Sequence, residues 1–79
     1  MFNEGDLVHI PQGVTMIRKV GDELAYMITE KPEVGIFLKY INKEKAWWSS
    51  ADEAEVVTTD GIAWNVAYKK ISFKEHYVG

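Results

Sequence analysis

One turn and the strand that follows it constrain the fold more than any other part of the sequence. Asp60-Gly61 is typical of tight hairpins, because a type I′ turn needs positive φ at both central residues. From Ile62 to Tyr68, large and small residues alternate, and Trp64 lies among the large ones. Alternation with a period of two indicates a half-buried β-strand. The stretch therefore predicts a strand that presents one apolar face to a core.

Further strands are indicated by short apolar runs that are separated by turn residues. Residues 7–10 form one such run, and residues 35–41 form another that is dense in aromatic and branched side chains. Residues 14–30 lack clean alternation, so this segment is either a hairpin or an irregular excursion. Turn signals at intervals of about 8–12 residues are typical of a sandwich or a barrel.

A short helical turn is also predicted. Ser50 and Glu53 have the Ser-x-x-Glu spacing of a capping box, but β-branched residues return at 56–59, so only one turn near residues 50–54 is expected. Closing a sheet removes its exposed edges, which suits a chain of 79 residues. We therefore expect an all-β fold, a single domain over residues 1–79, built as a small barrel of about five antiparallel strands.

Large apolar residues of these strands form the predicted core. They are Leu7, Val8, Ile10, Ile36, Leu38, Val56, Ile62, Trp64, Val66 and Ile71. Leu7 and Val8 cannot both face inward in a regular strand, and His9 is expected to point outward. Alternation places Tyr40 on the face of Ile36 and Leu38, with Phe37 opposite. Because that strand is apolar on both faces, something must cover its second face.

The composition argues against catalysis and metal binding. The chain has no Cys, which excludes disulfides, thiolate nucleophiles and thiolate metal sites. It has no Gly-rich phosphate loop, and neither His lies in a catalytic motif. The acids between residues 52 and 60 lack the order of a calcium loop, so a solvated loop with helix-cap carboxylates explains them better. We expect a protein that is not an enzyme and that uses no cofactor and no metal.

Charge and hydropathy narrow the classes of partner, and the cellular location, that we expect for this chain. The start of the chain has no signal-peptide pattern, and no apolar run approaches the ~20 residues that span a bilayer, which favours a cytoplasmic protein without a membrane partner. The net charge of −3 argues against indiscriminate binding to nucleic acid. The charge is uneven, however, with +2 over residues 31–50 and −4 over residues 51–60.

Basic and aromatic residues are interleaved in one stretch, which is the candidate binding site. They are Lys39, Tyr40, Lys43, Lys45, Trp47 and Trp48. Lysines neutralise phosphates and aromatic rings stack on bases, so a surface for single-stranded nucleic acid is one interpretation. Glu44 interrupts the lysines, and a solvated turn is the simpler explanation of them. Trp47 and Trp48 point to opposite faces if extended, so one needs cover from a satellite cluster, an oligomer interface or a ligand.

Three short blocks resemble the pattern of a known group. Gly-Asp-Leu-Val begins at Gly5, Pro-x-x-Gly ends at Gly35 before an apolar strand, and Gly-x-x-Trp-x-Val begins at Gly61. This order resembles small SH3-like barrel proteins encoded by tailed phages, cyanophages among them, whose roles are uncharacterised. The resemblance implies an SH3-like barrel and a phage origin, and it brings no catalytic motif. Residues 42–55 are an insertion relative to that pattern.

Together these observations predict a non-catalytic interaction module of phage origin, in the host cytoplasm, that binds a protein partner or associates with itself. The alternative is a small nucleic-acid-binding barrel that uses the lysine and aromatic residues between positions 39 and 48.

Overall fold

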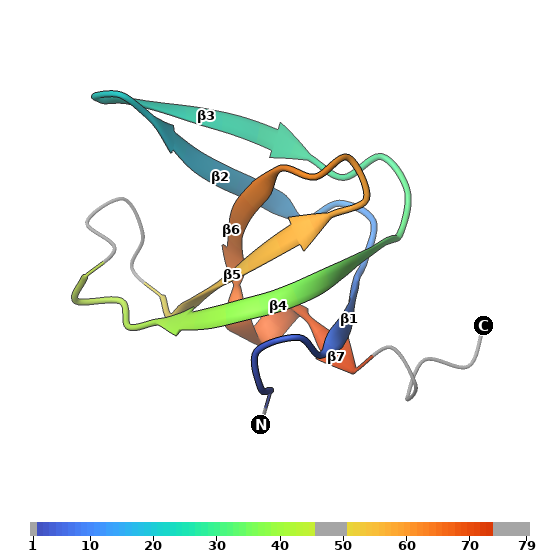
Figure 1. Ribbon diagram of the computed structural model, residues 1–79. Helices are drawn as coiled ribbons and strands as arrows, with labels where there is room; N and C mark the ends of the chain where they lie inside the picture. The colour runs from blue at the N-terminus through green and yellow to red at the C-terminus, as the bar shows by residue number, and fades with distance from the viewer. Residues whose placement is uncertain (1, 46–50, 74–79) are drawn as a thin grey trace.

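The computed structural model describes residues 2–45 and 51–73, and its regular elements there are strands and one 3₁₀ turn. The strands are β1 (Leu7–Ile10), β2 (Thr15–Val20), β3 (Glu23–Ile28), β4 (Glu33–Ile41), β5 (Glu53–Thr58), β6 (Ala63–Ala67) and β7 (Ser72–Phe73). They form one antiparallel sheet in the order β3-β2-β6-β5-β4-β1-β7 (Figure 1). The predicted all-β class is confirmed.

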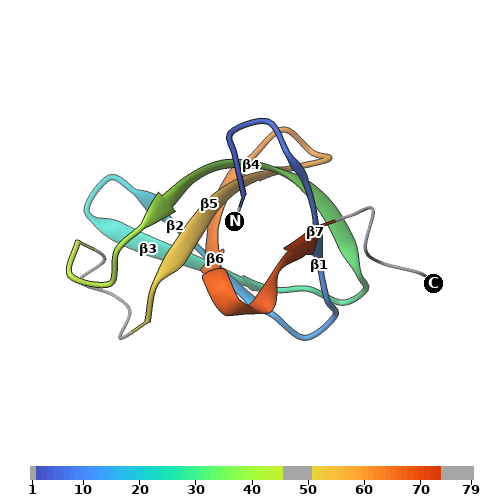
Figure 2. The ribbon, with the colours of Figure 1, turned by 90° about the horizontal axis from the view of Figure 1, so that it is seen from below.

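The sheet is more extensive and more open than expected. Seven strands replace the expected five, because the segment at 14–30 is a complete hairpin, β2–β3, and the short β7 adds an edge beside β1. The sheet curls strongly (Figure 2), but within the described residues β3 and β7 remain its two edges and do not pair with each other. The described strands therefore make a curled open sheet and not a closed barrel.

The expected helical turn near residues 50–54 is wrong for the part that the structure describes. Glu53 is the first residue of β5 and pairs with both Ile41 and Ala67. The side chain of Asp52 does not cap a helix, because its Oδ1 accepts a hydrogen bond from the backbone N–H of Lys43 at 2.9 Å. Instead, the 3₁₀ turn η1 (Tyr68–Lys70) follows β6.

The hairpin between β5 and β6 differs from the expected type I′ turn. Its loop has three residues, and the N–H of Gly61 donates to the carbonyl of Thr58 at 2.9 Å. Gly61 has a φ of 82°, whereas Asp60 has a negative φ. This combination is typical of a three-residue hairpin loop, in which a type I turn is followed by a glycine in the left-handed conformation. The carboxylate of Asp60 closes it by accepting from the Thr58 hydroxyl and from the N–H of Ile62.

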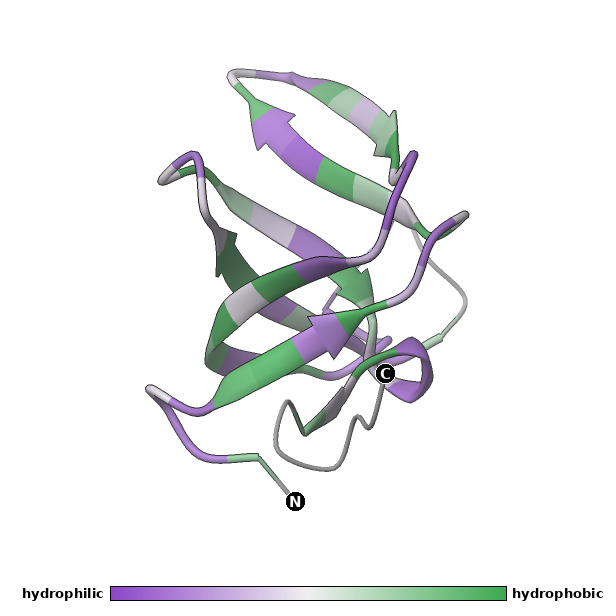
Figure 3. Cartoon of the chain, turned by 90° about the vertical axis from the view of Figure 1, so that its right-hand side faces the viewer, coloured by the Kyte–Doolittle hydropathy of each residue, from purple (hydrophilic) through white to green (hydrophobic). Residues whose placement is uncertain are grey.

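The core lies on the concave side of the curled sheet. Its buried residues are Val8, Ile10, Val14, Met16, Phe37, Ala54, Val56, Trp64, Val66 and Ile71. Burial alternates strictly along β6, whereas polar and apolar residues are mixed along the other strands that supply the core (Figure 3). The hairpin β2–β3 contributes Met16, which sequence alternation did not identify because the segment around it is irregular.

Six of the ten predicted core residues are buried: Val8, Ile10, Val56, Trp64, Val66 and Ile71. Leu7 and Ile36 are wrong, since they are 50% and 43% exposed on the convex side. Leu38 and Ile62 are only partly buried, although Ile62 packs against the core. The expectation that His9 faces solvent is wrong, because His9 is only 7% exposed on β1, which lies between β4 and β7 inside the sheet.

An irregularity in β4 explains why its faces differ from simple alternation. Before it, Gly35 and Phe37 point to the core; after it, Lys39 pairs with Glu55 and Tyr40 pairs with the buried Ala54. Leu38 is thus an extra residue, a β-bulge. The predicted grouping of Tyr40 with Ile36 and Leu38 is wrong, because the bulge moves Tyr40 to the face of Phe37.

Two methionines that pair across β2 and β3 test where the core ends. Met16 is fully buried, while its register partner Met27 is 37% exposed. We expect Met16→Ala to lower the free energy of unfolding by about 2–5 kcal/mol, because it removes buried volume from the core. Met27→Ala should cost less than about 1 kcal/mol. Urea denaturation of both variants measures the difference, and equal losses would contradict the assigned core.

Candidate binding site

A pocket lined largely by aromatic rings opens beside the N-terminal segment. Its lining residues are Phe2, Phe37, Tyr40, Asp52 and Tyr68, and its volume is about 570 Å³. We call it the aromatic pocket. Phe37 forms part of the core, whereas Tyr40 is 48% exposed. The rings that line the pocket therefore range from buried to half exposed, and the pocket extends from the hydrophobic core to the solvent.

The rings hold one another in fixed orientations. Tyr40 meets Tyr68 with centroids 5.2 Å apart at an angle of 90°, and Phe2 meets Tyr68 at 5.5 Å and 74°. Phe2 also lies 5.5 Å from Phe37 and 4.5 Å from Phe73. Edge-to-face pairs of this kind add about 0.5–1.5 kcal/mol beyond area burial. The pocket wall is consequently a packed cluster and not a set of independent side chains.

The rings reach the pocket from three parts of the chain, since Phe37 and Tyr40 both lie on β4. The bulge at Leu38 turns Tyr40 toward the concave side, which is a known use of bulges near functional sites. Tyr68 stands where β6 ends and η1 begins, and its N–H donates to the carbonyl of Asp52 at 3.0 Å. Phe2 is placed by the turn before β1, where the N–H of Gly5 donates to the carbonyl of Phe37.

Asp52 connects two polar groups at the edge of the pocket. Its carboxylate accepts hydrogen bonds from the Tyr40 hydroxyl and from the N–H of Lys43, and these two contacts hold its pKa below the ordinary value. The same hydrogen bond to Asp52 raises the pKa of Tyr40, with partial burial and the negative charge of Asp52 acting in the same direction. Ionising Tyr40 would break this contact and place two negative charges together.

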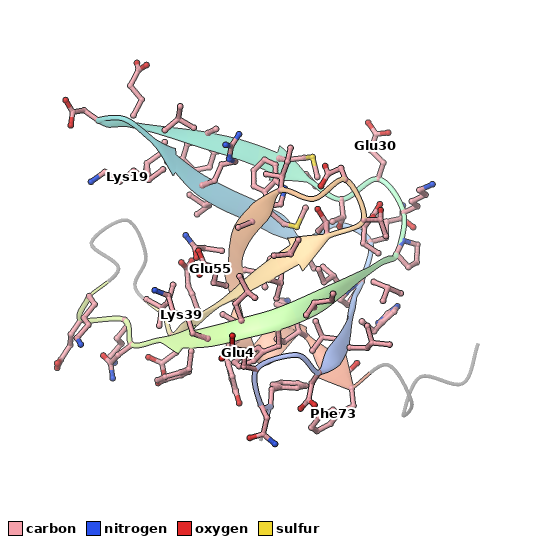
Figure 4. All side chains as sticks on the ribbon, viewed as in Figure 1. Glu4, Lys19, Glu30, Lys39, Glu55 and Phe73 are labelled. Carbon is pink, nitrogen blue, oxygen red and sulfur yellow. The ribbon has the colours of Figure 1, made fainter. Side chains whose placement is uncertain are left out.

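A second, smaller depression adjoins the aromatic pocket and shares Tyr40 with it. It is lined by Lys39, Tyr40, Ile41, Asn42 and Lys45 and has a volume of about 460 Å³. Three of the predicted site residues, Lys39, Tyr40 and Lys45, are therefore brought together. Lys39 also faces Glu55 across the strand pair (Figure 4), which offsets part of its charge.

Of the other predicted site residues, the structure describes one, and it is not among those that line this depression. Lys43 is exposed in the turn after β4, where its N–H is bonded to Asp52. Trp47 and Trp48 lie outside the described residues.

The aromatic pocket contains residues that the sequence did not point to as a site. Phe2 was taken only as part of the N-terminal segment, Tyr68 as part of a core-facing strand, and Asp52 as a helix cap. One signal was available: Tyr68 directly follows the strand Ala63–Ala67, where a ring can line an opening at the end of the sheet. Nothing in the sequence indicated that Asp52 would join two loops.

No three His, Asp or Glu residues within 2–45 and 51–73 lie close enough to hold a metal ion. The same two segments contain no helix that could span a bilayer.

No protein-family model matches the chain, and neither a curated protein nor a solved structure does. The site is therefore interpreted from its own geometry and chemistry.

The Tyr40–Asp52 contact predicts a residue-specific titration. We expect Asp52→Asn to lower the pKa of Tyr40 toward its ordinary value of 10.0, because the carboxylate that raises it is lost. NMR titration of the Tyr40 ring measures the pKa. Asp60→Asn is the matched control, since Asp60 accepts from Thr58 and Ile62 and from no tyrosine. An unchanged pKa in Asp52→Asn, or an equal fall in Asp60→Asn, would contradict the contact.

The same pair loses its contribution to folding stability at both ends of the pH range. The raised pKa of Tyr40 contributes stability that is complete below pH 10.0 and is lost as the pH rises through the folded-state pKa. The lowered pKa of Asp52 contributes stability that is complete above pH 3.8 and is lost as the pH falls through the folded-state pKa. The contact is therefore fully formed across the neutral range.

Proposed function

We propose that this chain is a small, non-catalytic interaction module that binds a protein partner through the aromatic pocket. The observation that carries the proposal is the pocket itself: a mostly apolar hollow of about 570 Å³ with one carboxylate and one exposed tyrosine at its edge. Binding sites commonly combine apolar walls with a few convergent polar groups. The exposed Tyr40 and the partly buried Tyr68 are of the type that interfaces favour.

The pocket chemistry suits a bulky apolar side chain of a peptide. The rings of Phe2, Tyr40 and Tyr68 supply contact area, and their mutual packing means that little side-chain entropy is lost on binding. The carboxylate of Asp52 is available at the rim as an acceptor for a peptide N–H, although it already holds the hydroxyl of Tyr40. We therefore place the anchor residue of the partner in the pocket, against the rings of Phe2, Tyr40 and Tyr68.

The proposal includes an SH3-like identity and a phage origin, with the host cytoplasm as location. The sequence pattern supports it through three glycines that have physical reasons to be there. Gly5 has a φ of 94° and Gly61 a φ of 82°, and a Cβ on Gly35 would lie 3.2 Å from the carbonyl oxygen of Val57. The phage origin and the location depend on that pattern alone.

Selection from a random peptide library tests the proposal. We expect the wild-type protein to enrich peptides with a recurrent apolar anchor, and we expect Tyr40→Ala to bind the selected peptides at least about tenfold more weakly. Ile36→Ala is the matched control, because Ile36 is 43% exposed on the same strand but on the convex side, away from the pocket. Selected peptides that bind Tyr40→Ala as tightly as the wild type would refute the proposed site.

A second candidate function is binding of single-stranded nucleic acid. The observation that favours it is the depression that joins Lys39, Tyr40 and Lys45. A base stacked on Tyr40 with phosphates near the lysines is the arrangement that such binding uses. Glu55 beside Lys39 weighs against it, as does the net charge of −3.

Salt dependence separates the second candidate from the first. If oligothymidylate binds, about three lysine–phosphate contacts predict a roughly twentyfold loss of affinity between about 50 and 200 mM salt. The double variant Lys39→Glu, Lys45→Glu should abolish binding, while Lys19→Glu, Lys31→Glu, which has the same net charge, should retain it. Fluorescence anisotropy measures both. Absence of binding at low salt, or equal loss in the two double variants, would eliminate this function.

A further inference from the structure

Strand β3 is an edge of the sheet, and its apolar side chains are unusually exposed. Among the described strands it pairs only with β2. Tyr26 is 63% exposed and Ile28 is 61% exposed, although both lie within a regular strand. The strand contains no Lys and no Pro, which are residues that commonly protect natural edges from pairing.

The hydrogen-bond pattern identifies which backbone groups face away from β2. In an antiparallel ladder, bonded and non-bonded pairs alternate. The N–H of Thr29 donates to the carbonyl of Val14 at 3.0 Å, so the non-bonded positions of β3 are the even-numbered ones. The N–H and C=O groups of Leu24, Tyr26 and Ile28 therefore point to the open edge. Residues two apart share a face, so the side chains of these three residues also line up together.

A pocket adjoins the C-terminal end of β3. It has a volume of about 610 Å³ and is lined by Met27, Ile28, Thr29, Glu30, Lys31 and Glu33. Met27 and Ile28 give it apolar surface, and the two carboxylates outnumber the single ammonium group. The pocket can receive a long side chain that has an apolar stem and a cationic end.

Charge decides what kind of strand fits this edge. Residues 20–33 carry four acids, Asp22, Glu23, Glu30 and Glu33, against one base, Lys31, which gives −3. Glu30 lies at one end of the hairpin, and Lys19, the register partner of Leu24, lies near the other end (Figure 4). Pairing β3 with a second copy would bring two segments of −3 together, which opposes self-association at this edge. A basic strand would be attracted instead.

We propose that β3 accepts an added strand from a partner protein, an extended segment with apolar residues on one face and Lys or Arg on the other. Its backbone pairs with Leu24, Tyr26 and Ile28, and its basic side chains meet the acids that flank the hairpin. Strand addition of this kind draws affinity from main-chain hydrogen bonds and specificity from side-chain pockets. The site is separate from the aromatic pocket and does not depend on it.

Amide hydrogen exchange with a synthetic probe tests this site. The probe is the amidated peptide Lys-Val-Arg-Val-Thr-Val-Arg-Val-Lys, added to the wild-type protein. We expect it to slow exchange at the N–H groups of Leu24, Tyr26 and Ile28, while Ala25 and Met27, which already donate to β2, change little. No slowing at the three open-edge amides would overturn the proposal.

Control peptides and variants separate strand addition from other binding. A probe with N-methyl groups on alternate residues, or with Glu in place of Lys and Arg, should bind at least about tenfold more weakly. Ile28→Lys should weaken the basic probe similarly, whereas Leu7→Lys, at a residue 50% exposed on β1, should leave binding within about twofold. Equal binding of the N-methylated or acidic probe would overturn the proposal.

Two further outcomes are decisive. Tyr40→Ala should leave binding of the probe unchanged; if it abolishes binding, the probe occupies the aromatic pocket and β3 is not its site. If the three open-edge amides of the free protein are already slow to exchange, and more so at higher protein concentration, the occupant is a second copy and the proposed basic partner is refuted.

Discussion

The extra residue in β4 determines how the rest of the molecule can be arranged. Up to Phe37 the strand pairs with β5 in one register, and from Lys39 onward it pairs in another. Without the bulge at Leu38, Tyr40 would point to the convex side with Ile36, and Phe37 would end the aromatic side of the core. With the bulge, Phe37 and Tyr40 lie on the same face, and the interior extends outward into the aromatic pocket.

The aromatic pocket is therefore continuous with the core and contributes to holding the fold together. A domain of 79 residues buries only about 60% of its unfolded surface, so a peripheral cluster matters to its stability. Phe2 packs on Phe37 and Phe73, which come from β4 and β7. The rings that line the aromatic pocket are thus also among the contacts that hold the N-terminal segment and the last strand against the sheet.

Local patterning predicted the regular parts of the fold and missed what depends on distant partners. The alternation from Ile62 to Tyr68 identified β6 and the burial of Trp64 and Val66, because one strand face determines that pattern. The bulge at Leu38 could not be foreseen, since it reflects pairing with β5 and leaves no mark in β4 itself. Asp52 looked like a helix cap because the same carboxylate can accept from any nearby N–H.

The candidate site was likewise predicted where its residues are close in sequence and missed where they come from distant segments. Lys39, Tyr40 and Lys45 were predicted because they are close in sequence, and the structure places them along one depression. Phe2 and Tyr68 were missed as partners of Tyr40, because their proximity arises only when the N-terminal segment and η1 meet at β4. Sequence spacing reveals sites within one segment better than sites assembled from three.

The contacts of Asp52 determine how far the length of the β4–β5 connection can change. Its carboxylate binds the N–H of Lys43, and its carbonyl accepts from the N–H of Tyr68, so the base of the β4–β5 connection is fastened to the aromatic pocket. The residues that line the pocket therefore lie outside the part of the connection that runs between Lys43 and Asp52. The number of residues in that part can change at little entropic cost, which allows the connection to lengthen or shorten while the pocket keeps its shape.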